Sequence, residues 1–212
     1  MITVKSFVFG PFQENTYLLI NEDKKAIIVD PGFYEAEERD LFDGYLQEHV
    51  LKPVLLLNTH CHLDHVFGNA HIHRTYGLQP CLHPLEKPVL DHGPAVGLMY
   101  NLPFEGYMGD VQPLEHGQTL LLGSDAFEVL FVPGHSPGHV CFYHAGQQFL
   151  IAGDTLFHRS IGRTDLPGGN HADLLRSIRE VLFSLPDEVI VHSGHGPVTT
   201  IGEEKKENPF LQ

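Results

Sequence analysis

The chain has 212 residues, of which 42% are hydrophobic and 19% charged, and its formal net charge is −14 at pH 7. This length and composition are typical of one globular domain with a sizeable hydrophobic core. The acidic balance argues against nucleic-acid binding, because phosphate contacts require clustered Lys and Arg. No apolar run approaches the roughly 20 residues that span a bilayer, so no membrane contact is expected.

Three cysteines, Cys61, Cys81 and Cys141, are spread over the chain. An odd and sparse set argues against a disulfide framework and favours a reducing compartment. The first residues have no long apolar segment behind them, so no signal peptide is predicted. We therefore expect a cytoplasmic protein with a single domain over residues 1–212.

The N-terminal third begins with three apolar segments separated by turn residues. We expect residues 2–9, 16–20 and 26–29 to form an antiparallel meander, which Asp30 ends in an Asp-Pro-Gly turn. Apolar residues at helical spacing then predict a helix over 35–49.

Residues 59–65 read Thr-His-Cys-His-Leu-Asp-His and follow a short apolar strand at 53–58. Imidazole and carboxylate groups are ligands for zinc, iron and manganese. Alternate side chains of an extended or turning backbone point the same way, so His60, His62 and Asp64 are expected to converge. His65 is then aimed at a neighbouring position. The geometry suits two adjacent metals better than one, and it points Cys61 away from them.

After this motif, a helix is predicted over 67–76 and a short strand over 80–83. His71 and His73 lie two positions apart on the helix and are expected at the surface. Residues 84–117 contain five prolines and show no clear period. Long irregular loops are often binding loops or lids, and we expect Tyr100 and Tyr107 to help wall a site there.

The second half alternates short strands and turns. Hairpins are expected within 120–132 and 140–152, a helix over 171–185 and a last strand over 188–192. Further metal-ligand types follow apolar strands in turns that contain glycine: His135, Asp154 and His195. Glycine beside a ligand lets the backbone turn tightly.

The motif at 59–65 resembles the T-H-x-H-x-D-H signature of the metallo-β-lactamase superfamily, and the resemblance extends from the first strand to His195. It implies an α/β fold, a four-layer αββα sandwich with two metals at one edge between the sheets. It also implies that Asp30 lies near the metals. The implied ligand sets are His60, His62 and His135 for one metal; Asp64, His65 and His195 for the other; and Asp154 as the bridge.

The mechanism that this resemblance implies is hydrolysis by a hydroxide that bridges two divalent metals, zinc above iron or manganese. Zinc lowers the pKa of bound water to about 7, and a metal can polarise a substrate carbonyl. Asp64 is expected to be a ligand that also orients the hydroxide. No side-chain nucleophile is required.

A serine-hydrolase motif competes with this interpretation, because residues 134–138 fit G-x-S-x-G around Ser136. In such an elbow the residue after the serine donates a backbone N–H to the oxyanion. Here that residue is Pro137, which has no N–H, and a hairpin rather than a helix follows. We therefore expect Ser136 to be structural.

Residues 153–157, 160–165, 168–169, 194–205 and 208–210 resemble the short glyoxalase II-like hydrolases. Asp154, where β-lactamases have Cys or Ser, argues against that activity. The implied substrate is an acyl thioester of glutathione or a similar thiol, such as S-lactoylglutathione. We expect no counterpart of the C-terminal helical domain with which longer relatives grip glutathione. Candidates for holding an anionic carrier are therefore Arg159, Arg163 and Lys205, unless Arg163 is instead paired with an acid.

Two alternatives use the same residues. Persulfide dioxygenases of this fold hold one iron at a two-His, one-carboxylate site, which corresponds here to His60, His135 and Asp154. Hydrolysis of a lactone or another ester would use the same metal chemistry as thioester hydrolysis. Two bound metals favour hydrolysis, and one iron with oxygen uptake favours the dioxygenase.

Overall fold

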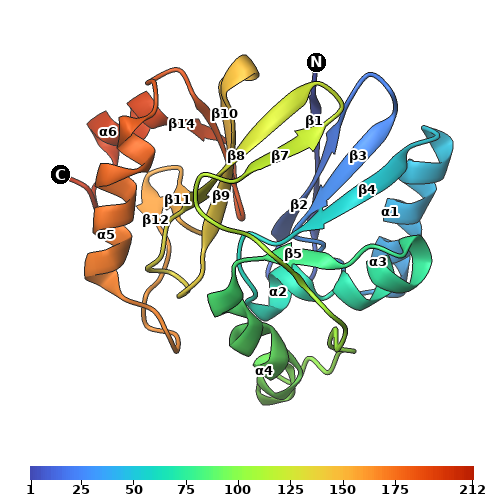
Figure 1. The fold of residues 1–212 in the computed structure, drawn as a ribbon. Helices are drawn as coiled ribbons and strands as arrows, with labels where there is room; N and C mark the ends of the chain where they lie inside the picture. The colour runs from blue at the N-terminus through green and yellow to red at the C-terminus, as the bar shows by residue number, and fades with distance from the viewer.

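Two six-stranded β-sheets face each other, and helices cover the outer face of each sheet (Figure 1). The computed structural model describes all residues from 1 to 212. The expected αββα sandwich is confirmed. The turns that carry the candidate ligands lie at one edge of this sandwich, where several strands end.

The first sheet has the strand order β1-β2-β3-β4-β5-β6. Strands β1 to β3 are antiparallel, as predicted, whereas β4 to β6 each add in parallel. The bounds are β1 (Thr3–Phe9), β2 (Glu14–Ile20), β3 (Lys25–Val29), β4 (Lys52–Leu57), β5 (Pro80–Leu82) and β6 (Gln112–Pro113).

The second sheet has the order β14-β13-β10-β9-β8-β7. Both predicted hairpins, β7 with β8 and β9 with β10, are present. The bounds are β7 (Thr119–Leu122), β8 (Asp125–Phe131), β9 (Val140–His144), β10 (Phe149–Gly153), β13 (Ile190–Ser193) and β14 (Thr199–Thr200). A separate two-stranded ribbon, β11 (Leu156–Phe157) with β12 (Ser160–Ile161), follows β10.

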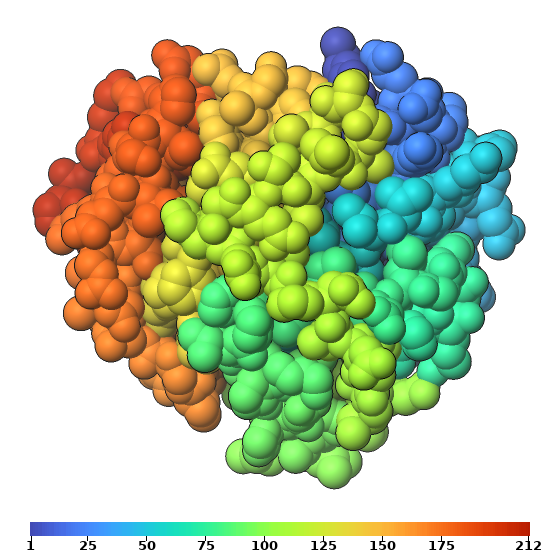
Figure 2. Space-filling view, viewed as in Figure 1, coloured from blue at the N-terminus to red at the C-terminus, as the bar shows by residue number.

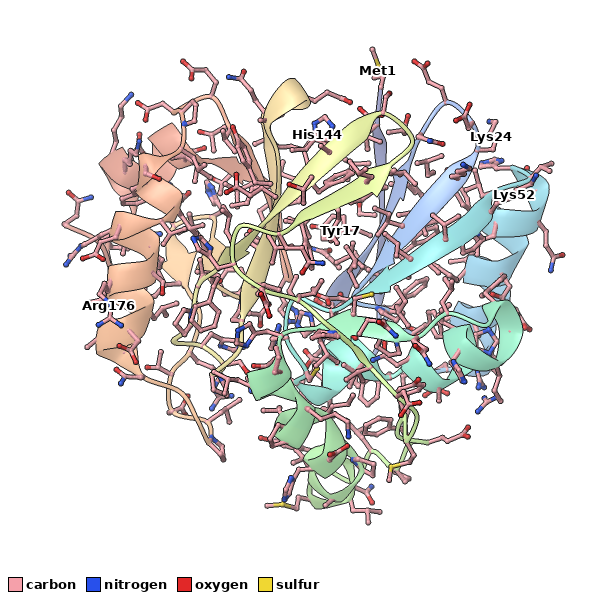
Figure 3. The ribbon with its side chains drawn as sticks, viewed as in Figure 1. Met1, Tyr17, Lys24, Lys52, His144 and Arg176 are labelled. Carbon is pink, nitrogen blue, oxygen red and sulfur yellow. The ribbon has the colours of Figure 1, made fainter.

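The main core fills the space between the sheets. Leu19 and Ile27 of the first sheet are fully buried there with Phe127 and Phe142 of the second. Tyr17 lies between the sheets (Figure 3), and its hydroxyl donates a hydrogen bond of 2.6 Å to the Ser193 carbonyl. Burial of this apolar surface holds the two sheets together.

Helices α1 (Ala36–Glu48) and α3 (Asn69–Tyr76) cover the first sheet, and α5 (His171–Glu180) and α6 (Ile201–Glu207) cover the second. Asn170 caps α5, as its side chain accepts a hydrogen bond from the Asp173 N–H. The helix expected over 67–76 begins at 69, because residues 63–66 of the motif form their own turn, α2 (Leu63–Val66). The helix expected over 171–185 ends at 180 and is followed by a 3₁₀ turn, Leu182–Ser184. No helix is both long and apolar enough to cross a membrane.

The irregular segment predicted over 84–117 is partly wrong, because it contains α4 (Lys87–Met99). Pro88 lies in the first turn, where a missing N–H costs little, but Pro94 interrupts the interior of the helix. The helix forms because it packs closely on the loop after it: a Cβ at Gly97 would lie 2.6 Å from the Leu102 carbonyl oxygen. Phe104 packs beneath the same turn. The prolines and glycines of this segment therefore predicted a loop, whereas tertiary packing stabilises a helix.

Candidate metal centre

All seven candidate ligands converge at one edge of the sandwich. Residues 60–65 follow β4, His135 follows β8, Asp154 follows β10 and His195 follows β13. Gly194 permits the approach of the last turn, since a Cβ there would lie 2.1 Å from Asp154 Oδ1. The residues thus arrive from four strand ends that belong to both sheets.

One group of three nitrogens comes from His60, His62 and His135. His135 Nε2 lies 3.2 Å from His60 Nε2 and 2.9 Å from His62 Nδ1. Three imidazoles facing one point are a common ligand set for a divalent transition metal.

A second group comes from Asp64, His65 and His195. Asp64 Oδ2 lies 3.3 Å from His195 Nε2 and 3.9 Å from His65 Nε2. This group combines a carboxylate with two imidazoles, which suits zinc, iron or manganese.

Asp154 lies between the two groups. Its Oδ2 is 3.5 Å from His135 Nε2 of the first group and 3.5 Å from His195 Nε2 of the second, and its Oδ1 is 3.4 Å from His65 Nε2. The carboxylate therefore faces both groups, as a bridging ligand must.

Unpartnered polar atoms show that this donor set fits metal ions. His65 Nε2 and Asp154 Oδ1 are buried and have no hydrogen-bond partner. Buried polar atoms are normally paired, because an unpaired one costs about 1–3 kcal/mol. A pair of divalent cations would satisfy these atoms and the crowded imidazole nitrogens together.

Burial controls the protonation of the first group. It lowers the pKa of His60 and His135, and with repulsion from His135 it lowers the pKa of His62 to about 3. The three rings are thus held neutral, which is the form that binds metal.

In the second group, the neighbouring carboxylates together have a larger effect on the pKa of His65 than burial has. Burial opposes the charged form of His65, yet Asp154 and Asp64 raise its pKa well above the ordinary value. Burial likewise opposes ionisation of Asp154, but His65 lowers its pKa overall. A bound cation would take the place of the proton on His65 and would balance the negative charge of the two carboxylates.

The other ring nitrogens of His65 and His135 are fixed by neighbouring residues. His65 Nδ1 lies 3.0 Å from Asp30 Oδ2, and His135 Nδ1 lies 2.8 Å from the Arg163 carbonyl oxygen. Asp30 also accepts hydrogen bonds of 2.7 Å from the Thr59 N–H and 2.6 Å from its hydroxyl. Asp30 thus lies against a candidate ligand, as the resemblance implied. Such partners set the ring orientation and the nitrogen that ligates.

Sequence reasoning missed Glu86, which joins two ligand loops. Its buried carboxylate accepts hydrogen bonds from the Cys61 N–H at 2.7 Å, the Gly138 N–H at 2.7 Å and the Ser136 hydroxyl. No local signal marked it, because it precedes α4 in the segment that looked irregular. Ser136 is buried and donates to this acid, which fits the structural role expected for it.

His139 was also missed, although it lies in the same turn as His135. Its Nε2 accepts a hydrogen bond of 3.1 Å from the Asp154 N–H, and its Nδ1 lies 3.2 Å from the Thr155 hydroxyl. The glycines of this turn, which already indicated His135 as a candidate ligand, could also have indicated His139 as a residue that positions Asp154. Cys61 is buried and belongs to neither ligand group.

A cavity of about 880 Å³ opens beside the ligands, between α4 and the segment that follows β12. These two segments form separate projections at the lower edge of the molecule in the space-filling view (Figure 2). Of the five candidate substrate-binding residues, Tyr100 and Arg163 line the cavity.

The other three candidates lie elsewhere. Tyr107 is buried, with its hydroxyl donating to the Asp110 carbonyl oxygen at 2.6 Å. Lys205 pairs with Asp187 at 2.6 Å. The third, Arg159, pairs with Glu203 and Glu207 of α6. The two basic side chains point toward their partner acids, and none of the three residues lines the cavity.

Comparisons with known proteins agree with this fold. Residues 9–195 match the family model described as the metallo-beta-lactamase superfamily. A hydroxyacylglutathione hydrolase, GloC, of Haemophilus influenzae is 36% identical over 202 residues, which cover 94% of this chain and 93% of that protein.

Two solved structures are each 39% identical to the chain. One is described as the BLEG-1 B3 metallo-beta-lactamase, with a TM-score of 0.90 over 99% of this chain and 100% of that one. The other is described as TTHA1623 in a di-iron-bound form, with a TM-score of 0.89 over 98% of this chain and 100% of that one.

Proposed function

Because the chain belongs to the metallo-β-lactamase superfamily and is similar over nearly its whole length to a hydroxyacylglutathione hydrolase, we propose that it hydrolyses acyl thioesters. The reaction is glyoxalase II-like, with S-lactoylglutathione as the reference substrate. The proposed cofactor is a pair of divalent cations, with zinc as the first choice and iron or manganese as the alternatives.

The observation that carries this proposal is the shared position of Asp154 between two ligand groups. His60, His62 and His135 would hold one cation and Asp64, His65 and His195 the other. When bound, two such cations activate water at neutral pH and stabilise negative charge on a carbonyl oxygen.

Protein residues would orient the water and hold the substrate. Asp64 faces the cavity and the second group, so its carboxylate can orient a water molecule toward a thioester carbonyl. The cavity walls would hold the acyl group and keep bulk solvent from it. A thiolate is a good leaving group, so a dedicated general acid is not needed.

The test measures metal content and turnover together. Protein purified with zinc, iron or manganese should contain two metals per chain and release thiol from S-D-lactoylglutathione. Asp154→Asn should lose the second metal and at least 100-fold in kcat, whereas Asp187→Asn, far from the ligands, should change neither. Two bound metals with no thiol release from any acyl thioester would overturn the proposal.

Two further assays separate the alternatives. One of the similar structures is described as a β-lactamase, so hydrolysis of a chromogenic β-lactam should be measured in parallel. Oxygen uptake with glutathione persulfide tests the dioxygenase, whose single iron would be held by His60, His135 and Asp154. One metal per chain together with oxygen uptake would replace the hydrolase proposal.

A further inference from the structure

The walls of the cavity are apolar on both sides. Residues of α4 and of the turns on either side of it form one wall at helical spacing: Leu85, Val89, Val96 and Tyr100. The opposite wall consists of Phe157, Ile161, Leu166 and Pro167, from β11, β12 and the following loop. The candidate ligands lie at the junction of the two walls, so a substrate that reaches them must lie against apolar surface.

Cationic side chains are scarce in the lining of this cavity. Apart from the metal-ligand candidates and the exposed His92, Arg163 is the only residue of its lining with an ionisable side chain other than a thiol or phenol. The Arg163 guanidinium already binds the Asp165 carboxylate through Nε and Nη2, with contacts of 2.7 Å each, so that acid offsets its charge. Away from the candidate metal ligands, a carboxylate in the cavity would lose water and meet only a guanidinium that is already paired with an acid, which is unfavourable.

The rim continues the apolar surface. Phe12 and Tyr100 meet edge to face, with ring centroids 6.1 Å apart, and both line the cavity although 40% and 50% exposed. The carbonyl oxygen of Phe12 also lies 3.1 Å from His195 Nδ1. The segment that helps fix a candidate ligand therefore also presents an aromatic ring to the substrate.

We propose that the cavity selects thioesters with an uncharged, apolar acyl group of several carbons, and that an anionic thiol carrier adds little. This inference rests on the proposed thioester hydrolysis and narrows its substrate class. It assigns Val96 and the α4 wall as determinants of specificity.

The test compares acetyl, butyryl and hexanoyl thioesters of N-acetylcysteamine, an uncharged carrier, with the same acyl groups on glutathione. Each methylene buried from water is worth on the order of a fourfold gain in affinity. We expect kcat/KM to rise at least tenfold from acetyl to hexanoyl, with the two carriers within about threefold of each other. A flat acyl series, or a glutathione preference above tenfold, would overturn the proposal.

Matched variants locate the effect. Val96→Asp places a charge on the cavity wall, and Leu98→Asp makes the same change two residues later, at a side chain that is 68% exposed and outside the lining. Val96→Asp should reduce the hexanoyl-to-acetyl ratio to below threefold, and Leu98→Asp should preserve it. Equal ratios in the two variants would remove α4 from specificity, and circular dichroism checks that both fold.

A binding measurement keeps the inference separate from the proposed function. The non-hydrolysable thioethers S-ethyl- and S-hexyl-N-acetylcysteamine should bind the metal-loaded protein with affinities at least tenfold apart by calorimetry. If no thioester is hydrolysed but the hexyl compound binds more tightly, the proposed function fails and the apolar selectivity stands. If hydrolysis occurs but the two affinities are equal, the selectivity fails alone.

Discussion

Asp30 Oδ2 lies 3.0 Å from His65 Nδ1, so this carboxylate directs the opposite ring nitrogen of His65 toward Asp154. The interaction joins the turn after β3 to the motif after β4. Asp30 has a positive φ of 48°, a conformation that Asp and Asn adopt more readily than most residues. The geometry therefore constrains both the backbone and the side chain at this position.

We predict that Asp30→Asn weakens metal binding without unfolding the protein. Asn tolerates the same backbone conformation but does not support His65 with a negative charge. Loss of such a partner typically costs 10–100-fold in metal affinity. Competition with a chelator of known affinity measures the change.

The matched control is Asp43→Asn, which alters a similar pair away from the ligands, since Asp43 Oδ2 lies 2.8 Å from His71 Nε2. This variant should retain the wild-type affinity. Equal affinities for both variants and the wild type would contradict the role assigned to Asp30.

Metal removal should lower stability, because the buried Asp154 and His65 atoms then lack partners. A ligand at 100 times its Kd stabilises the folded state by about 2.7 kcal/mol per site, which is roughly 5–10 °C in Tm for a chain of this size. Thermal unfolding with and without a chelator measures the difference. Asp154→Asn should unfold at a temperature that depends much less on metal. A wild-type Tm that chelation leaves unchanged would contradict metal binding here.

The candidate ligands could be picked out from the sequence because each lies within a few residues after an apolar strand. His60 and His195 are far apart in the chain, but strand ends of a sandwich meet at its edges, and family resemblance supplied the pairing. Glu86 had no such local signal. Its role depends on contacts with Cys61 and Gly138, which only the folded chain brings together.

Substrate contacts were harder to predict, because a long cationic side chain can reach several acids. Lys205 points to Asp187, and Arg159 points to α6, although both follow in sequence from ligand-bearing turns. Helix α4 was not predicted, because Pro94 and the glycines of this segment disfavour a helix. Apart from Tyr100, the residues of this helix that line the cavity were therefore not predicted from the sequence.

Ser136→Ala should retain most of the hydrolytic activity. The Ser136 hydroxyl is buried and donates to Glu86, so its removal takes one hydrogen bond from that carboxylate and leaves those from Cys61 and Gly138. We expect a stability loss of about 1–2 kcal/mol and a turnover rate within fivefold of wild type. Steady-state kinetics with urea unfolding provide both values. A loss of turnover by about three orders of magnitude, as expected for removal of a nucleophile, would revive the serine-hydrolase alternative.

Stability should also fall in mild acid because of His192. This ring packs edge-on against Tyr17 and Phe149, with centroids 5.6 and 5.9 Å away, and burial lowers its pKa to about 4. The unfolded chain, with an ordinary His pKa near 6.5, binds more protons between these two values. His192 thus adds stability that is fully present above pH 6.5 and is lost as the pH falls toward 4.

The expected contribution is about 1–3 kcal/mol, measured as the free energy of unfolding in urea at pH 7.5 and pH 4.5. His192→Gln cannot titrate, so it should lose less stability than the wild type across this interval. The exposed His171 provides the control, and His171→Gln should follow the wild-type curve. Because the buried ligand histidines titrate in all three proteins, the difference between the curves isolates His192. Parallel curves for His192→Gln and wild type would show that the ring accepts a proton without cost to the fold.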